Sequence, residues 1–130
     1  MNEQLYISIA EDHPLAEKES VNFEDLKGLR ILMDGNIGFW MDFCRDKLSQ
    51  SDLLIQNGFD AFSELVQASR LPLFNSDQFL ARGYAPPDRV SIPITDPEAH
   101  ATYYLCCLSS EQRAYRSLFN AVRGNVLRSK

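Results

Sequence analysis

An α/β fold, arranged as a three-layer sandwich around a mostly parallel sheet, is the architecture that this sequence predicts. Short apolar runs such as residues 29–33 and 53–55 have the length and composition of buried strands. Segments with apolar side chains every three or four residues lie between these runs and are typical of amphipathic helices. Because the two kinds of segment alternate and short loops join them, the chain favours helices packed on a sheet.

The first third of the chain predicts two strands and a short helix. Residues 5, 7 and 9 are leucine or isoleucine and alternate with Tyr6, Ser8 and Ala10, which indicates a strand with one strongly apolar face. Residues 22–28 predict a single helical turn, in which Asn22 caps the start and Gly28 provides a left-handed exit. Residues 29–33 then form an apolar run that predicts a buried strand of a parallel sheet.

The middle of the chain predicts two further strand–helix pairs. A helix with one apolar face is expected from about residue 39 to 48, and residues 52–56 predict a second buried strand. Asp60 is a credible cap for the next helix, whose inward residues fall within 62–66. Pro72 places the strand-like run that follows at a strand start or a sheet edge.

The last third predicts a short helix, two strands and a longer helix. Residues 77–82 indicate a brief helix that ends at Gly83. Residues 90–94 alternate like a strand, and Pro93 restricts that strand to an edge or a crossover segment because proline has no N–H to donate. Residues 101–108 predict a return strand. The final helix is expected to open at Ser109 and to run to about residue 127.

Length, charge and cysteine usage limit the classes of protein. At 130 residues, the chain is expected to form one domain. Its net charge of −5 disfavours direct binding of nucleic acid by this chain. No leader is evident and no apolar run is long enough to span a bilayer, so no membrane association is expected. Three cysteines without a pairing pattern predict reduced thiols and a cytoplasmic protein: Cys44, Cys106 and Cys107.

Catalytic and metal-binding patterns are absent from the sequence. His13 and His100 each lie beside turn residues, and neither has a recognised nucleophile motif nearby. No Cys/His metal spacing and no glycine-rich phosphate loop is present, so neither a metal nor a cofactor is expected. Cys44 shares a helix face with Trp40 and is interpreted as a buried structural thiol.

Two loops are candidates for binding a small molecule. In open α/β sheets, ligands bind outside the carboxyl ends of the strands, where loops lead into helix amino termini. The loop at residues 33–39 is expected to be such a place, because its glycines allow close approach and amides at a helix start can hold an anion. The turn at residues 68–73 is expected to be a second such place. The candidate ligand-binding residues are Met33, Asp34, Gly35, Asn36, Gly38, Phe39, Ser69, Leu71 and Pro72.

Four short motifs in order resemble the effector-binding domain of LysR-type transcriptional regulators. They are His-Pro-Leu-Ala from His13, Asp-Leu-Lys-Gly from Asp25, Leu-Val-Gln-Ala-Ser-Arg-Leu-Pro from Leu65 and Ile-Pro-Ile-Thr-Asp from Ile92. The order and spacing match from about residue 5 to 122. The family often has glycines in the turn where this chain has Ser69 and Leu71.

The resemblance implies a fold related to one lobe of the type 2 periplasmic binding proteins. It implies a crossing strand at about residues 4–10, a second lobe at about 11–95, and a return strand and last helix at about 101–127. On this interpretation the DNA-binding head and most of the first lobe have no counterpart in the chain. The chain would then be a partial effector-binding domain with its cleft open on one side.

The resemblance also implies a function and partners. It predicts an effector-sensing module without catalysis, whose ligand is a small anionic or polar molecule. Apolar surface left open where the first lobe would pack predicts a homodimer, with exchanged crossing strands as one form. A solute-binding protein of a transport system is the main alternative, because the fold is shared. An enzyme that uses His13 or His100 is the third hypothesis.

Overall fold

The computed structural model describes residues 1–48 and 52–128, with side chains described through residue 123. The chain divides into two compact units, which are Glu3–His100 and a second unit of Met1–Asn2 with Ala101–Lys130. The larger unit contains the mixed sheet and four helices. The smaller unit contains a short strand and the last helix.

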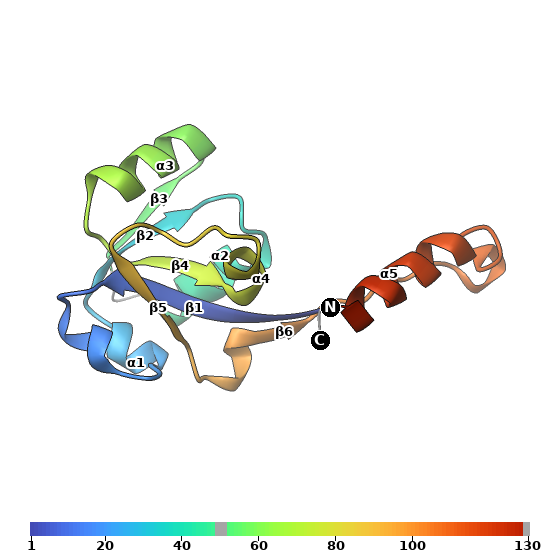
Figure 1. Ribbon diagram of the computed structural model, residues 1–130, viewed down its shortest axis with the longest axis horizontal. Helices are drawn as coiled ribbons and strands as arrows, with labels where there is room; N and C mark the ends of the chain where they lie inside the picture. The colour runs from blue at the N-terminus through green and yellow to red at the C-terminus, as the bar shows by residue number, and fades with distance from the viewer. Residues whose placement is uncertain (49–51, 129–130) are drawn as a thin grey trace. The chain divides into compact units, whose positions relative to one another are not determined.

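The sheet of the larger unit is mixed, and its strands follow the spatial order β3-β2-β4-β1-β5 (Figure 1). Strand β2 pairs in parallel with β3 and β4, whereas β1 pairs antiparallel with β4 and β5. The five strands are β1 (Asn2–Ala10), β2 (Arg30–Asp34), β3 (Asp52–Gln56), β4 (Leu73–Ser76) and β5 (Arg89–Pro93).

The α/β class is therefore confirmed, but the expectation of a mostly parallel sheet is wrong. Apolar periodicity tells which face of a strand is buried, and it says little about the direction of a strand relative to its neighbours. Strand β1 runs against both of its partners, with Ile7 opposite Phe74 on one side and Ile92 on the other. Half of the pairings in the five-strand order are consequently antiparallel.

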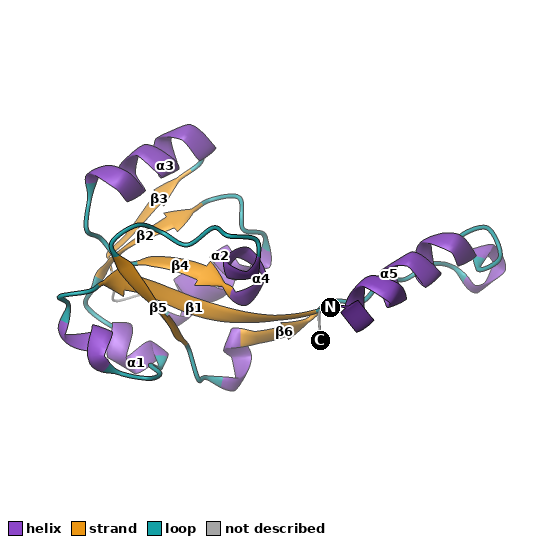
Figure 2. Ribbon diagram, in the orientation of Figure 1, coloured by secondary structure: helices purple, strands orange, loops and turns teal. Residues whose placement is uncertain are grey.

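Four helices pack on this sheet (Figure 2). They are α1 (Phe23–Leu26), α2 (Phe39–Lys47), α3 (Phe59–Ala68) and α4 (Asp77–Ala81). The connection through α2 moves outward from β2 to β3, and the connection through α3 moves back past β2 to β4. Right-handed crossovers in opposite directions place α2 and α3 on opposite faces of the sheet. This arrangement gives the expected helix–sheet–helix layers.

The core lies between the sheet and these helices. Strand β2 contributes three successive buried side chains, as expected for a strand covered on both faces. Trp40 and Cys44 are buried on the inner face of α2, one helical turn apart. Ile7, at the centre of β1, is completely buried.

The capped turn expected at residues 22–28 is present. The Asn22 side chain accepts from the Asp25 N–H at 2.9 Å, and the Asp25 carboxylate accepts from the Asn22 N–H at 3.1 Å. This reciprocal pair is a capping box, which satisfies amides that a helix start leaves without partners. Gly28 leaves the turn with φ of +84°, in the left-handed region that glycine adopts without strain.

Two local expectations in the middle of the chain are wrong. Strand β3 is an edge strand, not a second buried strand, because β2 is its one neighbour in the sheet order, and its Leu54 is exposed. Helix α3 begins after Gly58, so Asp60 lies inside the first turn and does not cap it. The edge position expected for the strand that contains Pro93 is confirmed, since β5 ends the order on the other side.

Strand β6 (His100–Thr102), whose last two residues belong to the smaller unit, pairs with β1. The Tyr103 N–H donates to the Met1 carbonyl at 2.7 Å, so the pairing reaches the first residue of the chain and does not extend to residue 108. The return strand is therefore shorter than expected. Helix α5 (Arg116–Arg128) also starts later than Ser109, because a separate 3-10 turn, Ser109–Glu111, precedes it.

Candidate functional site

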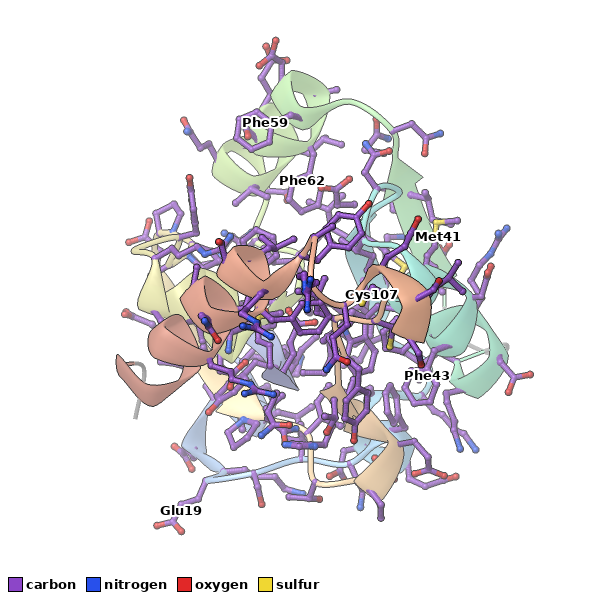
Figure 3. The ribbon with its side chains drawn as sticks, turned by 90° about the vertical axis from the view of Figure 1, so that its right-hand side faces the viewer. Glu19, Met41, Phe43, Phe59, Phe62 and Cys107 are labelled. Carbon is purple, nitrogen blue, oxygen red and sulfur yellow. The ribbon has the colours of Figure 1, made fainter. Side chains whose placement is uncertain are left out.

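The loops that follow β2 and β3 are tied to each other at the carboxyl ends of these strands. The Gly35 N–H donates to the Gln56 carbonyl at 2.8 Å, and the Asn36 amide donates to the Asn57 carbonyl at 3.2 Å. The Asn36 N–H also donates to the Asp34 carboxylate at 2.9 Å. These bonds hold the polar loop expected from the sequence against the loop that leads into α3. Figure 3 shows the side chains as seen from the right-hand side of Figure 1.

Two glycines shape this loop in different ways. A Cβ added to Gly35 would collide with the Oδ1 atom of Asn57, so the present position of the Asn57 side chain depends on glycine at residue 35. Gly38 adopts φ of +65° and ψ of −137°, a conformation that is strained for residues with a side chain. The loop therefore enters α2 at an angle that other residues disfavour.

Helices α2 and α3 both begin at this edge with glycine at the N-cap position, Gly38 and Gly58 respectively. Glycine has no side chain with which to accept from the first helical amides. The other two helices of the unit differ, because the side chains of Asn22 and Ser76 cap α1 and α4. The first N–H groups of a helix carry partial positive charge and form a ready site for an anion when no side chain occupies them.

Aromatic side chains stand at the first position of both helices. Phe39 of α2 is 49% exposed and Phe59 of α3 is 69% exposed. Phe39 stacks on the buried Trp40, with 4.5 Å between the ring centroids. Amide donors beside exposed aromatic rings suit a small ligand that has an acidic group and an apolar body.

Not every residue expected at this loop faces solvent. The Met33 side chain is 1% exposed and belongs to the core, so it supports the loop from below. Asp34 and Gly35 are half-buried, whereas Asn36, Gly38 and Phe39 are exposed.

The second candidate segment, Ser69, Leu71 and Pro72, lies at the opposite edge of the parallel strands. It follows the C-terminus of α3 and precedes β4, and the Pro72 carbonyl accepts from the Leu32 N–H at 2.8 Å. Since β2 and β4 are parallel, this turn lies at their amino ends. The expectation that it marks a carboxyl end is wrong, because a helix-to-strand connection returns to the edge at which the strands begin.

Arg89 holds this second turn together and was not identified from the sequence. Its guanidinium donates to the carbonyls of Leu71 at 3.0 Å, Val66 at 3.0 Å and Ser69 at 2.8 Å, and also to that of Pro87 at 3.2 Å. Burial, and secondarily the charge of Arg70, lower the pKa of the Arg89 guanidinium. No sequence pattern links one arginine on an edge strand to a turn about twenty residues earlier.

The histidines and cysteines show no catalytic arrangement in the described part of the chain. His13 caps a 3-10 turn, since its Nδ1 accepts from the Leu15 N–H at 3.1 Å, and His100 is exposed at the start of β6. Burial raises the pKa of the Cys44 thiol to about 12, as expected for a structural cysteine. Among the residues described, no group of three or more His, Cys, Asp or Glu could hold a metal ion.

The smaller unit contains a hollow of about 480 Å³. Arg116, Phe119 and Arg123 line it from one side of α5, and Cys106 and Cys107 line it from the preceding segment. None of the residues expected to bind a ligand takes part. Within the described ranges, no helix is long and apolar enough to cross a membrane.

Solved structures similar to this chain are effector-binding regulators and a solute-binding protein. Oxidized OxyR is 24% identical, covers 95% of this chain and 62% of its own, and has a TM-score of 0.63. The BenM effector-binding domain with benzoate is 18% identical over 95% of this chain and 62% of its own, with a TM-score of 0.61. An ancestral cationic amino acid solute-binding protein is 16% identical over 77% and 42%, with a TM-score of 0.57. These likenesses establish the fold.

The chain spans less than two thirds of the length of the chains that it resembles, and 32% of a full-length OxyR variant from Pseudomonas aeruginosa. No match was found among curated proteins. The family model for the LysR substrate binding domain matches residues 1–126, which is nearly the whole chain. The chain therefore belongs to the LysR substrate-binding domain family.

Proposed function

We propose that this chain is the effector-sensing part of a LysR-type transcriptional regulator and that it binds a small anionic or polar molecule at the N-termini of α2 and α3. The family is regulatory and non-enzymatic. One observation carries the position of the site: two neighbouring parallel strands lead into helices with glycine N-caps, whereas side chains cap the other two helices of the unit. The two sets of amides would hold an acidic group of the effector.

In this proposal, the loop residues have distinct roles. Gly35 lets the loop lie against Asn57, and Gly38 directs the first turn of α2. Asn36 offers its side chain as a polar contact, and Phe39 offers an apolar surface. That Ser69, Leu71 and Pro72 contact the ligand directly stays a prediction. Their position at the amino ends of β2 and β4, away from the N-termini of α2 and α3, does not favour it.

Benzoate is a suitable first probe, because BenM, a protein of the same fold, is recorded with benzoate as its effector. Benzamide has nearly the same size and lacks the negative charge, so it is the matched control. Titration calorimetry of the 130-residue chain should detect benzoate and give a much weaker signal for benzamide. Equal signals for both compounds, or binding unaffected by a Gly38→Ala change, would contradict an anion site at α2.

A solute-binding function is the second candidate, and it is favoured by the similarity to the ancestral cationic amino acid solute-binding protein. A cationic ligand should avoid the positive ends of two helix dipoles. The regulator proposal therefore predicts that lysine does not compete with benzoate, whereas a transport protein for cationic amino acids would bind lysine. A competition titration separates the two functions.

We also propose a cytoplasmic homodimer as the assembly state of the chain. Leu118 and Val122 lie about one turn apart on α5, Tyr115 immediately precedes the helix, and all three are exposed. Apolar side chains grouped in this way favour association between copies. Light scattering over a range of concentrations should give the mass of a dimer, and a constant monomer mass would rule the dimer out.

The domain assignment is likewise a proposal. The larger unit, Glu3–His100, would include the second lobe. The smaller unit, Met1–Asn2 with Ala101–Lys130, would include segments that connect to a first lobe. Binding of DNA and control of genes would then belong to other parts of a complete regulator.

A further inference from the structure

A buried carboxylate links β1 to the first turn of α2. Glu3 is 8% exposed, and its Oε1 atom accepts from the Trp40 indole N–H at 2.7 Å. Its Oε2 atom accepts from the Ser76 hydroxyl at 2.8 Å. The partners come from α2 and from the junction of β4 and α4, and both are less than 5% exposed.

Burial of this group implies that its hydrogen bonds are important. A carboxylate removed from water is destabilising unless polar partners compensate for the lost hydration, and hydrogen bonds to a charged group are stronger than neutral ones. Glu3 therefore has a fixed position with respect to Trp40 and Ser76. The sequence alone did not mark Glu3, because one acidic residue near a chain end has no pattern.

The neighbouring residue of β1 extends the same connection. The Gln4 N–H donates to the Asp77 carboxylate at 3.0 Å, so successive residues of β1 hold the start of α4. The Gln4 side chain donates to the Ile94 carbonyl at 2.7 Å, beyond the end of β5. Strand β1 is thus fixed to α2, α4 and the segment after β5 within two residues.

We propose that Glu3 is a positioning residue that couples the α2 end of the effector site to β1 and to the start of α4. Trp40 is the second residue of α2 and lies two positions after Gly38, so it belongs to the helical turn whose amides would bind the effector. A small shift of that turn on anion binding changes the geometry of the Trp40–Glu3 bond directly. This inference rests on the proposed effector site and adds a named route from that site into the sheet.

The first test needs no ligand. Trp40→Phe keeps an aromatic ring and removes the indole N–H, which leaves one Glu3 oxygen without that donor. Coupling predicts faster hydrogen exchange at the Gln4 amide, which lies in β1 and not in α2. Arg45→Gln, a change at an exposed position of the same helix, is the control and should leave Gln4 exchange unchanged. Equal exchange of Gln4 in the wild type and Trp40→Phe would overturn the inference.

The second test uses benzoate and the only tryptophan of the chain. Benzoate should shift the loop amides of residues 35–39, the Trp40 indole N–H resonance and the Gln4 amide together. In Glu3→Gln the loop amides should still shift, the Gln4 shift should fall by at least half, and affinity should weaken by about fivefold, the low end for coupled sites. Glu24→Gln, a change at an exposed position of α1, should behave as the wild type.

The outcomes separate the two proposals. If the loop amides shift and the Gln4 shift is the same in the wild type and in Glu3→Gln, the effector site stands and Glu3 coupling is wrong. If benzoate moves no resonance in residues 35–39, the proposed site fails, and Glu3 coupling is then decided by the exchange experiment. A double-mutant cycle of Glu3→Gln and Trp40→Phe should be non-additive, and additivity would contradict a direct link.

Discussion

The two edges of the parallel strands differ in how their backbone groups are satisfied. At the carboxyl edge, α2 and α3 start with glycines and carry no capping side chain. At the amino edge, the Arg89 guanidinium occupies carbonyls of the turn between α3 and β4. The loops of the carboxyl edge lie on the right of the larger unit in Figure 1, and the Arg89-bound turn lies on the left.

We therefore call the carboxyl edge, where α2 and α3 begin, the binding edge. The amino edge, where Arg89 holds the turn between α3 and β4, is the structural edge. Helix-start amides that no side chain caps can be used by a ligand, and carbonyls that an internal arginine occupies add stability. The two edges should therefore respond differently to substitution. Changes at Arg89 should alter stability without altering ligand binding, and changes at the glycines should alter binding as well.

The largest expected effect is at the structural edge. Arg89→Met keeps part of the side-chain volume and removes every guanidinium hydrogen bond, so it should lower the free energy of unfolding by about 3 kcal/mol. Urea denaturation measures this loss. Arg89→Lys is the control and should recover part of the stability, because an ammonium group reaches fewer carbonyls. Benzoate affinity should be unchanged when the Arg89→Met variant is measured in its folded state. A weaker affinity would contradict the distinction between the two edges.

A pair of glycines tests the binding edge. Gly38→Ala and Gly28→Ala each place a side chain on a residue with positive φ, and neither new Cβ has an atom within 4 Å. Both should lower the free energy of unfolding by about 1–2 kcal/mol through backbone strain. Thermal unfolding should thus give similar shifts. Only Gly38→Ala should also weaken benzoate binding, and equal affinities for the two variants would argue against the role of α2.

Thiol reactivity tests whether α2 is firmly packed although no side chain caps its N-terminus. Cys44 is fully buried in α2, whereas Cys106 and Cys107 are exposed. A disulfide reagent should label two thiols rapidly and the third at a rate set by unfolding. Rapid labelling of all three would show that α2 is loosely held.

The pKa of Cys44 also predicts a change of stability with pH. Burial raises the folded pKa to about 12, so the neutral thiol contributes its full stability below the ordinary pKa of a cysteine. This contribution should be lost progressively as the pH rises toward about 12. In Cys44→Ala the decline of unfolding free energy above pH 9 should be shallower. An unchanged slope would indicate that the thiol is not buried in solution.

The smallest effect is expected at a surface ion pair of the structural edge. Asp12 and Arg70 lie 2.7 Å apart, and both side chains are mostly exposed. The Arg70 guanidinium lowers the pKa of the Asp12 carboxyl, so the pair persists at neutral pH and is lost as the pH falls through that lowered pKa. Asp12→Asn should not measurably change the unfolding temperature at neutral pH. A clear drop in the unfolding temperature would show that the Asp12–Arg70 ion pair, and not only the Arg89 hydrogen bonds, stabilises the turn between α3 and β4.

Local patterns in the sequence predicted single elements well and their spatial relations less well. The Asn22 cap and the Gly28 exit depend on neighbouring residues, and both are confirmed. The loop that contains Gly35 and Gly38 could also be predicted, because glycines mark a loop in the local sequence. Strand direction, the edge position of β3 and the side of the sheet on which Ser69 lies depend on contacts between distant residues, which one sequence does not display.

The partners of Arg89 and Glu3 are beyond sequence reasoning for the same reason. Each is a single polar residue whose contacts span from about twenty to more than seventy positions. Periodicity and motif spacing carry no information at that range. One weak signal exists for Glu3: it lies two residues before Leu5, in step with the alternating apolar positions of β1.

The central claim is that an anion binds at the carboxyl edge and not at the amino edge of the parallel strands. A two-dimensional amide spectrum of the ¹⁵N-labelled chain, recorded with increasing benzoate, tests it most directly. The account predicts saturable shifts at Gly35, Asn36 and Gly38, with Ser69 and Leu71 unmoved. Shifts confined to Ser69 and Leu71 would contradict it.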